Sequence, residues 1–222
     1  FAYMEGLREL GGGGGGYGIP NLERYIEANP ETYVHALVWA YRRGDKQADP
    51  EPFRVAPDRV REMAKRGHHL LEAIHRIPGH DDLGGLYAPR LSKWIATVRK
   101  MAAELDRTEI ADVSIGKLLA NAPAGEDGVW PCKPVRDVME ELQLEDVMHG
   151  AHTGLYNSRG VHWRGEGGDQ ERELAEKYRG WAKTLQISHP FVSSKLLMGM
   201  VRTYEREASD EDTASTLRRR LR

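Results

Sequence analysis

The chain has 222 residues, with 32 Lys+Arg against 34 Asp+Glu and a formal net charge of −2, which excludes a polycation that coats nucleic acid but leaves a local basic patch open. Its single cysteine, Cys132, excludes a disulfide framework and a cysteine-based zinc site and is typical of a reducing cytoplasm. No stretch approaches the roughly 20 consecutive apolar residues that span a bilayer, so we expect no membrane contact.

The chain opens with two short segments of contrasting composition. Within residues 1–10, Phe1, Met4 and Leu7 recur at intervals of three, which predicts an isolated N-terminal helix. Gly11–Gly16 is a run of glycine, the composition of a flexible linker. Such a run is either an engineered replacement of a loop or a stand-in for unassigned residues. We therefore expect a fragment of a larger protein.

Residues 17–222 show the apolar spacing of helices nearly throughout, without convincing β-alternation. Asn29-Pro30 is a strong helix start, because Asn caps the first turn and Pro tolerates its first position. The polar stretch Asp45–Pro57 is interpreted as a linker. Helices are predicted, in chain order, from Asn21 to Ile26, Pro30 to Tyr41, Asp58 to Ile77, Leu91 to Leu105, Ile110 to Ala120, Pro134 to Leu142, Leu174 to Leu185, Pro190 to Tyr204 and Ser209 to Arg222. The last of these is expected to be capped by Ser209, with Asp212 three residues later.

This pattern predicts an all-α fold. We expect an antiparallel array of helices, either HEAT-like or an irregular bundle. Proline and glycine punctuate residues 121–131, which makes that loop a candidate boundary between two parts of the helical domain. Stacked amphipathic helices present long surfaces that suit binding.

Residues 150–169 form the longest stretch interpreted as irregular, and loops of that length are usually functional or disordered. Gly165, Gly167 and Gly168 precede a helix start there, where free N–H groups favour an anion, but acidic residues crowd the same start and oppose phosphate. The alternative is a loop with a structural role, whose arginines bind acidic helix ends. The candidate binding residues are Asn157, Arg159, His162, Arg164, Gly167 and Gly168.

No catalytic or metal-binding arrangement stands out elsewhere. His149 and His152 lie three residues apart, but no carboxylate shares helix spacing with them, so we predict no metal site. A nucleophilic cysteine requires a base placed beside it, and the sequence offers none near Cys132. We predict no catalytic residue and no cofactor.

Five segments of the sequence are distinctive: Pro20–Tyr25, Asn29–Val34, His75–Gly79, Asp127–Pro131 and, above all, Asn157–Leu174. They resemble the C-terminal region of large, poorly characterised bacterial multidomain proteins, some of them in mobile or defence-associated loci. The resemblance covers nearly the whole chain. It implies an α-helical, repeat-like recognition or scaffold module, with any enzymatic or nucleotide-driven activity upstream, and it assigns no catalytic residue.

The sequence thus predicts a non-catalytic protein-interaction, sensor or scaffold module in the cytoplasm, whose partner is another protein or another domain of the parent chain. One alternative is a nucleic-acid-binding module, which requires Arg159, Arg164 and the terminal arginines to share one basic face. The other is a hydrolase of phosphate-containing substrates at residues 150–169. That reading requires His152 or His162 to meet a carboxylate in a concave pocket.

Overall fold

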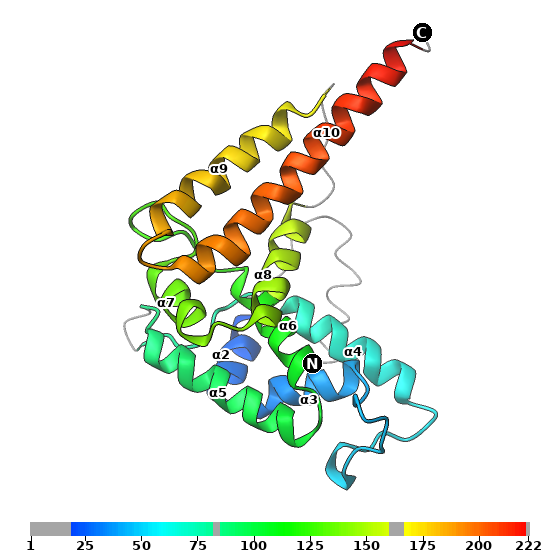
Figure 1. Ribbon diagram of the computed structural model, residues 1–222. Coiled ribbons are helices and arrows are strands. Elements are labelled where there is room, and N and C mark those ends of the chain that lie inside the picture. Colours follow the sequence, from blue (N-terminus) through cyan, green and yellow to red (C-terminus); the bar gives the residue numbers. More distant parts are fainter. Residues whose placement is uncertain (1–18, 82–84, 160–166, 221–222) are drawn as a thin grey trace. The chain divides into compact units, whose positions relative to one another are not determined.

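The computed structural model describes residues 19–81, 85–159 and 167–220, and over these residues the fold is all-α, as predicted (Figure 1). The described residues contain no strand, only an isolated antiparallel bridge between His80 and Leu86. The expected N-terminal helix and the glycine run lie outside the described residues.

The chain divides into two compact units, residues 1–114 and 115–222. The division falls inside helix α6 (Thr108–Leu119), upstream of the expected boundary near residues 121–131.

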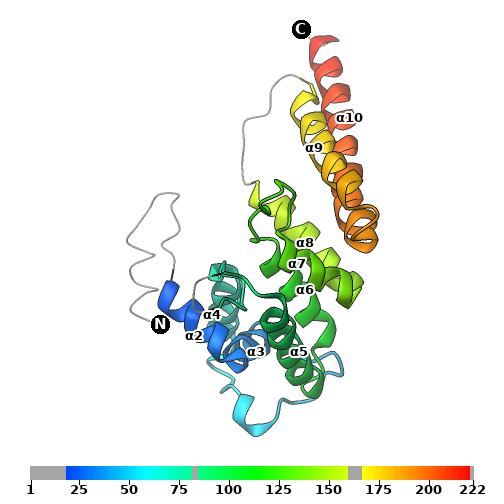
Figure 2. The same cartoon turned by 90° about the vertical axis from the view of Figure 1, so that its left-hand side faces the viewer.

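In unit 1, helix α3 is the central element, because α2, α4 and α5 all pack against it (Figure 2). The helix predicted from Pro30 to Tyr41 is present, and its residues Tyr33, Val34 and Leu37 are buried. Trp94 of α5 lies edge-on to Tyr33, with ring centres 5.1 Å apart. The helices of this unit are α2 (Pro20–Ala28), α3 (Pro30–Ala40), the short 3-10 helix η1 (Glu51–Phe53), α4 (Val60–Ala73), α5 (Ala88–Glu104) and the first part of α6.

Helix α4 ends at Ala73, four residues before the predicted end at Ile77. The reason is competition for backbone hydrogen bonds. Glu23 accepts the N–H groups of His75 and Arg76, at 2.8 and 3.0 Å, so these groups do not continue the helical ladder.

Glu27, one turn further along α2, binds the next part of the segment that follows α4. It accepts the N–H groups of Gly79 and His80, at 2.8 and 2.6 Å, and a bond from Arg76. Burial raises the pKa of Glu27, but these hydrogen bonds outweigh burial and leave the pKa below its usual value. The carboxylates of α2 therefore fix the backbone of residues 75–80.

Unit 2 is built around two long antiparallel helices, α9 and α10, which lie side by side in both views (Figures 1 and 2). Tyr178 of α9 stacks on Tyr204 of α10, with ring centres 5.7 Å apart. The helices of this unit are the second part of α6, α7 (Lys133–Leu142), α8 (Glu145–Ser158), α9 (Asp169–Leu185), the π-helical segment η2 (Val192–Leu197) and α10 (Met198–Arg220).

Helix α8 corrects the prediction of an irregular segment from residue 150, because the chain is helical through Ser158. Glycines lie where α8 meets α6, and a side chain has no room there. A Cβ added at Gly116 of α6 would lie 2.1 Å from the carbonyl oxygen of Val147, and one at Gly154 would lie 2.6 Å from the Cβ of Ala120. Small side chains thus let the backbones of α6 and α8 approach closely.

Helix α10 corrects a second prediction, that of a separate last helix capped by Ser209. The helix continues unbroken from the π-helical segment to Arg220, with Ser209 exposed in its interior. Asp212, the expected partner in that cap, instead accepts the N–H of Gly168 at 3.0 Å. It therefore caps the neighbouring helix α9.

Two glycine substitutions test the close approach of α6 and α8. Gly116→Ala is expected to reduce the free energy of unfolding by about 1–3 kcal/mol, because the new Cβ overlaps the backbone of α8. Gly180→Ala is the matched control, since nothing lies within 4 Å of its Cβ position, and it is expected to stabilise by about 0.5–1 kcal/mol. Denaturant unfolding measures both values. Stabilisation by both substitutions would contradict the packing described.

Candidate functional site

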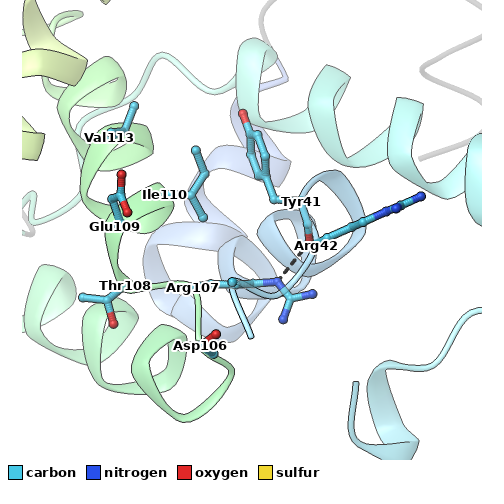
Figure 3. Close-up of a pocket in the computed structure, with 9 residues that line it drawn as sticks. Tyr41, Arg42, Asp106, Arg107, Thr108, Glu109, Ile110 and Val113 are labelled. Carbon is cyan, nitrogen blue, oxygen red and sulfur yellow. Dashed lines mark hydrogen bonds between the residues drawn. The ribbon is translucent and has the colours of Figure 1, made fainter. Parts of the chain in front are cut away.

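The side chain of Arg107 is 1% exposed, although it is charged, and it organises the region between α3 and α6. It forms two hydrogen bonds with the carboxylate of Asp49, at 2.8 and 2.9 Å. It also donates to the carbonyl oxygens of Tyr41, at 3.0 Å, and Leu105, at 2.8 Å (Figure 3). Every nitrogen of this buried guanidinium is thus bonded, as burial of a charge requires.

The segment that follows α3 is ordered by this and other contacts. The carboxylate of Asp106 accepts the N–H of Asp45 at 2.6 Å. A hydrogen bond from Arg43 lowers the pKa of Asp45 to about 2, helped by the N–H of Gln47. Residues 45–57, interpreted from the sequence as a linker, are instead held in place by hydrogen bonds and ion pairs. We call this segment the wall.

The segment also packs an aromatic side chain against α3. The ring of Phe53 meets the ring of His35 edge-on, with centres 4.9 Å apart. Arg54 donates to the carbonyl oxygen of Asp49 at 2.9 Å and to Glu51 at 2.8 Å. These contacts fix η1 against α3 and leave a hollow between the segment, the end of α3 and the first turns of α4.

We call this hollow the α3–α4 groove; it has a volume of about 690 Å³ and lies within unit 1. Its lining is mostly apolar, and Val60 on its edge is 47% exposed. The apolar lining residues are Val38, Trp39, Ala40, Tyr41, Ala48, Phe53, Val55, Pro57, Val60, Met63 and Ala64.

The charged residues of the groove are mostly arginine. Arg107 is neutralised by Asp49, and Arg54 by the neighbouring Glu51. Arg42 and Arg61 also line the groove, and within the described part of the chain neither contacts a carboxylate. Two positive charges without an acidic partner among the described residues therefore border an apolar surface.

A second hollow, of about 540 Å³, lies beside the groove and shares Tyr41, Arg42 and Arg107 with it. Figure 3 shows Ile110 and Val113 among its lining residues, while the Arg42 side chain extends away from both. Arg107 lines both hollows.

The residues predicted as a binding site belong to unit 2, and the structure brings only some of them together. Asn157 is exposed in the last turn of α8, and Arg159 follows it. His162 and Arg164 lie outside the described residues. Gly167 has a φ of +88°, and Gly168 is the N-cap of α9.

Gly168 closes the start of α9 against α10. A Cβ at this position would lie 2.3 Å from the carbonyl oxygen of Ala208. Asp212 occupies the Gly168 N–H that an anion would need, and bonds from Arg172 and from that N–H lower the pKa of Asp212. A carboxylate of α10 therefore already lies at the start of α9, where an external anion would bind.

Arg159 is directed into the protein. Its Nη2 donates to Glu171 at 2.9 Å, and the side chain of Glu171 is 1% exposed. Its Nη1 lies 3.7 Å from Glu207, and its guanidinium lies over the ring of Tyr204. Of the two readings of this region, the contacts of Arg159 match the structural one, in which the arginine binds acidic helix residues.

The histidine of unit 2 that was considered for chemistry has a hydroxyl partner. The Nε2 of His152 lies 3.0 Å from Thr203 Oγ1, and burial lowers the pKa of His152. Burial also raises the pKa of the Cys132 thiol, away from the reactive thiolate. Among the residues that the structure describes, no group of His, Cys, Asp and Glu side chains could hold a metal ion.

A further arrangement escaped the sequence analysis. His189 lies 2.8 Å from Ser188 Oγ through Nδ1 and 2.8 Å from Asp137 through Nε2, the residue order of a Ser-His-Asp relay but with the two ring nitrogens exchanged. Such a relay also needs N–H donors for an oxyanion. The nearest ones, of Phe191 and Val192, already donate to the carboxylate of Glu140. The cluster therefore fastens the start of the last helix to α7.

Comparison of the chain with protein-family models, with curated proteins and with solved structures finds no match. In the described parts of the chain, no helix combines the length and the apolar character needed to cross a membrane. The function must therefore be argued from the geometry of the groove and of the ion pairs.

Charge reversal tests the structural role of Arg159. Arg159→Glu is expected to lower the free energy of unfolding by about 3–5 kcal/mol, because it places a second negative charge against the buried carboxylate of Glu171. Arg206→Glu, on the exposed side of α10, is the control and is expected to change stability by only about 0.5 kcal/mol. Thermal unfolding of both variants gives the comparison. Equal melting temperatures of the two variants would contradict the structural role of Arg159 and would leave it as a candidate binding residue.

Proposed function

We propose that this chain is a non-catalytic protein-interaction module of a larger cytoplasmic bacterial protein. In this proposal the α3–α4 groove binds a segment of a partner protein or of another domain in the parent chain. The observation that carries the proposal is the open, mostly apolar groove of about 690 Å³, whose far wall is fixed by the buried pair of Arg107 and Asp49.

Apolar grooves on helical scaffolds commonly receive an amphipathic segment, whose apolar side chains replace water on the groove floor. Trp39, Phe53 and Met63 offer large side chains for such contacts. A wall that is ordered before binding lowers the entropic cost of association. The ion pair therefore favours binding in addition to stabilising the fold.

The chemistry of the lining supports binding more than catalysis. The ionisable residues of the groove are four arginines, Asp49 and Tyr41, and burial raises the pKa of Tyr41, so its phenol keeps its proton. Arginine keeps its proton at any working pH and cannot act as a general base. Asp49 is engaged by both terminal nitrogens of Arg107. Proton transfer at this surface thus has no evident donor or acceptor.

The two alternatives from the sequence receive less support. For nucleic-acid binding, Arg159 is paired with Glu171, and Arg218 lies 3.8 Å from Glu211, so these cations do not form a free basic face. For a hydrolase, His152 bonds Thr203 where a carboxylate is required. The single, buried Cys132 supports the cytoplasmic placement.

Panning of a random peptide library against the purified 222-residue chain tests the proposal. We expect enriched peptides whose affinity falls roughly tenfold or more in Val60→Asn, because a buried apolar contact contributes more than about 1 kcal/mol to binding. Fluorescence anisotropy with labelled peptides measures the affinities.

Ile187→Asn is the matched control, since Ile187 is 88% exposed and lies in the other unit. It is expected to bind the same peptides as the wild type does. The proposal is wrong if no peptide is enriched, or if the enriched peptides bind Val60→Asn and the wild type equally.

A further inference from the structure

We infer that the α3–α4 groove selects an acidic amphipathic segment of a partner protein, one that places apolar side chains on the groove floor and Asp or Glu side chains against Arg42 and Arg61. This inference rests on the proposed function and adds the chemistry of the partner.

The charge of the groove carries the inference. Four arginines line it against one aspartate, Asp49. The pair of Arg107 with Asp49 and the pair of Arg54 with Glu51 are internal to unit 1. Arg42 and Arg61 are exposed and, across residues 19–81, 85–159 and 167–218, have no carboxylate partner. Their positive charges are therefore available to attract an acidic ligand.

The two arginines come from different walls of the groove. Arg42 follows the end of α3, and Arg61 lies in the first turn of α4, with the apolar residues Trp39 and Met63 on the same two elements. A ligand that fills the floor thus meets a guanidinium from each helix. Guanidinium groups bind carboxylates through paired, charge-assisted hydrogen bonds, so acidic residues are the complementary side chains.

An acidic segment also gains specificity from this arrangement. A basic segment would place like charges against Arg42 and Arg61 and would be repelled, whereas a neutral apolar one would leave both cations uncompensated. Val60, at the edge of the groove, is 47% exposed. An apolar residue of the ligand that covers it therefore gains binding free energy, because apolar surface is removed from water. The groove thus discriminates by composition, with apolar and acidic residues both required.

Nucleic acid is the other polyanion that arginines attract, but the groove suits it less. Affinity for nucleic acid grows with the number of phosphates neutralised, and two unpaired arginines beside an apolar floor supply few such contacts. We therefore assign the site to a protein segment and include an oligonucleotide in the test.

The experiment uses the 222-residue chain, the peptides enriched from the random library and a single-stranded oligonucleotide as a second probe. We expect the enriched peptides to combine apolar residues with Asp and Glu. Their affinity should fall roughly tenfold or more in the double variant Arg42→Glu/Arg61→Glu, and the loss should shrink at high salt, because salt screens exposed charges.

The control is Arg24→Glu/Lys100→Glu, which changes the charge of unit 1 by the same amount at two exposed positions outside the groove. It should bind the peptides as the wild type does. Thermal unfolding of both double variants shows whether each remains folded at the assay temperature, and Arg42→Gln/Arg61→Gln replaces the reversal if it does not.

Three outcomes would overturn the inference, each in its own way. Enriched peptides that are neutral or basic, and that lose affinity in Val60→Asn but not in the arginine variant, would leave the proposed function standing without its acidic partner. Binding of the oligonucleotide that the arginine variant abolishes, with no peptide enriched, would assign the surface to nucleic acid. Peptides that bind Val60→Asn and the arginine variant as tightly as the wild type would refute both proposals.

Discussion

The hydrogen-bonded pair of Arg107 and Asp49 is the interaction on which the candidate site depends. Arg107 joins the carbonyl end of α3 at Tyr41, the turn after α5 at Leu105 and the segment that contains Asp49. Removing a guanidinium from water costs several kcal/mol, which only a complete set of partners offsets. The same bonds that satisfy this cation place the wall of the groove, so burial of one charge determines the shape of an apolar surface.

Arginine–carboxylate pairs also order connecting segments in unit 2. Arg159 follows α8 and meets the buried Glu171 at the start of α9, and Arg136, 6% exposed, meets Asp127 before α7. In each case an arginine fixes a connecting segment next to the end or the start of a helix. A protein with 30% charged residues can thus order its connections without a larger apolar core. Ordered connections favour binding surfaces, because less conformational entropy is lost when a partner arrives.

The apolar stripes of the helices could be predicted from the sequence, because helical periodicity is local, as in α3. The helical state of residues 150–158 could not, since Gly154 reads as a loop residue until its contact with Ala120 is known. The groove was missed for a related reason. Residues 45–57 are polar and rich in turn formers, and their order comes from Arg107, 58 residues beyond Asp49 in the chain. Phe53 and Val55, apolar residues inside a polar stretch, were the available signal.

Hydrogen exchange over residues 45–57 in Asp49→Ala tests most directly whether the buried ion pair builds the wall. In the wild type, the N–H groups of Phe53 and Arg54 donate to backbone carbonyls at 2.9 and 3.2 Å, so their exchange should be slow. Asp49→Ala is expected to remove this protection across the segment, whereas Glu51→Ala, which breaks only an exposed pair with Arg54, should leave most of it. Unchanged protection in Asp49→Ala would contradict the account.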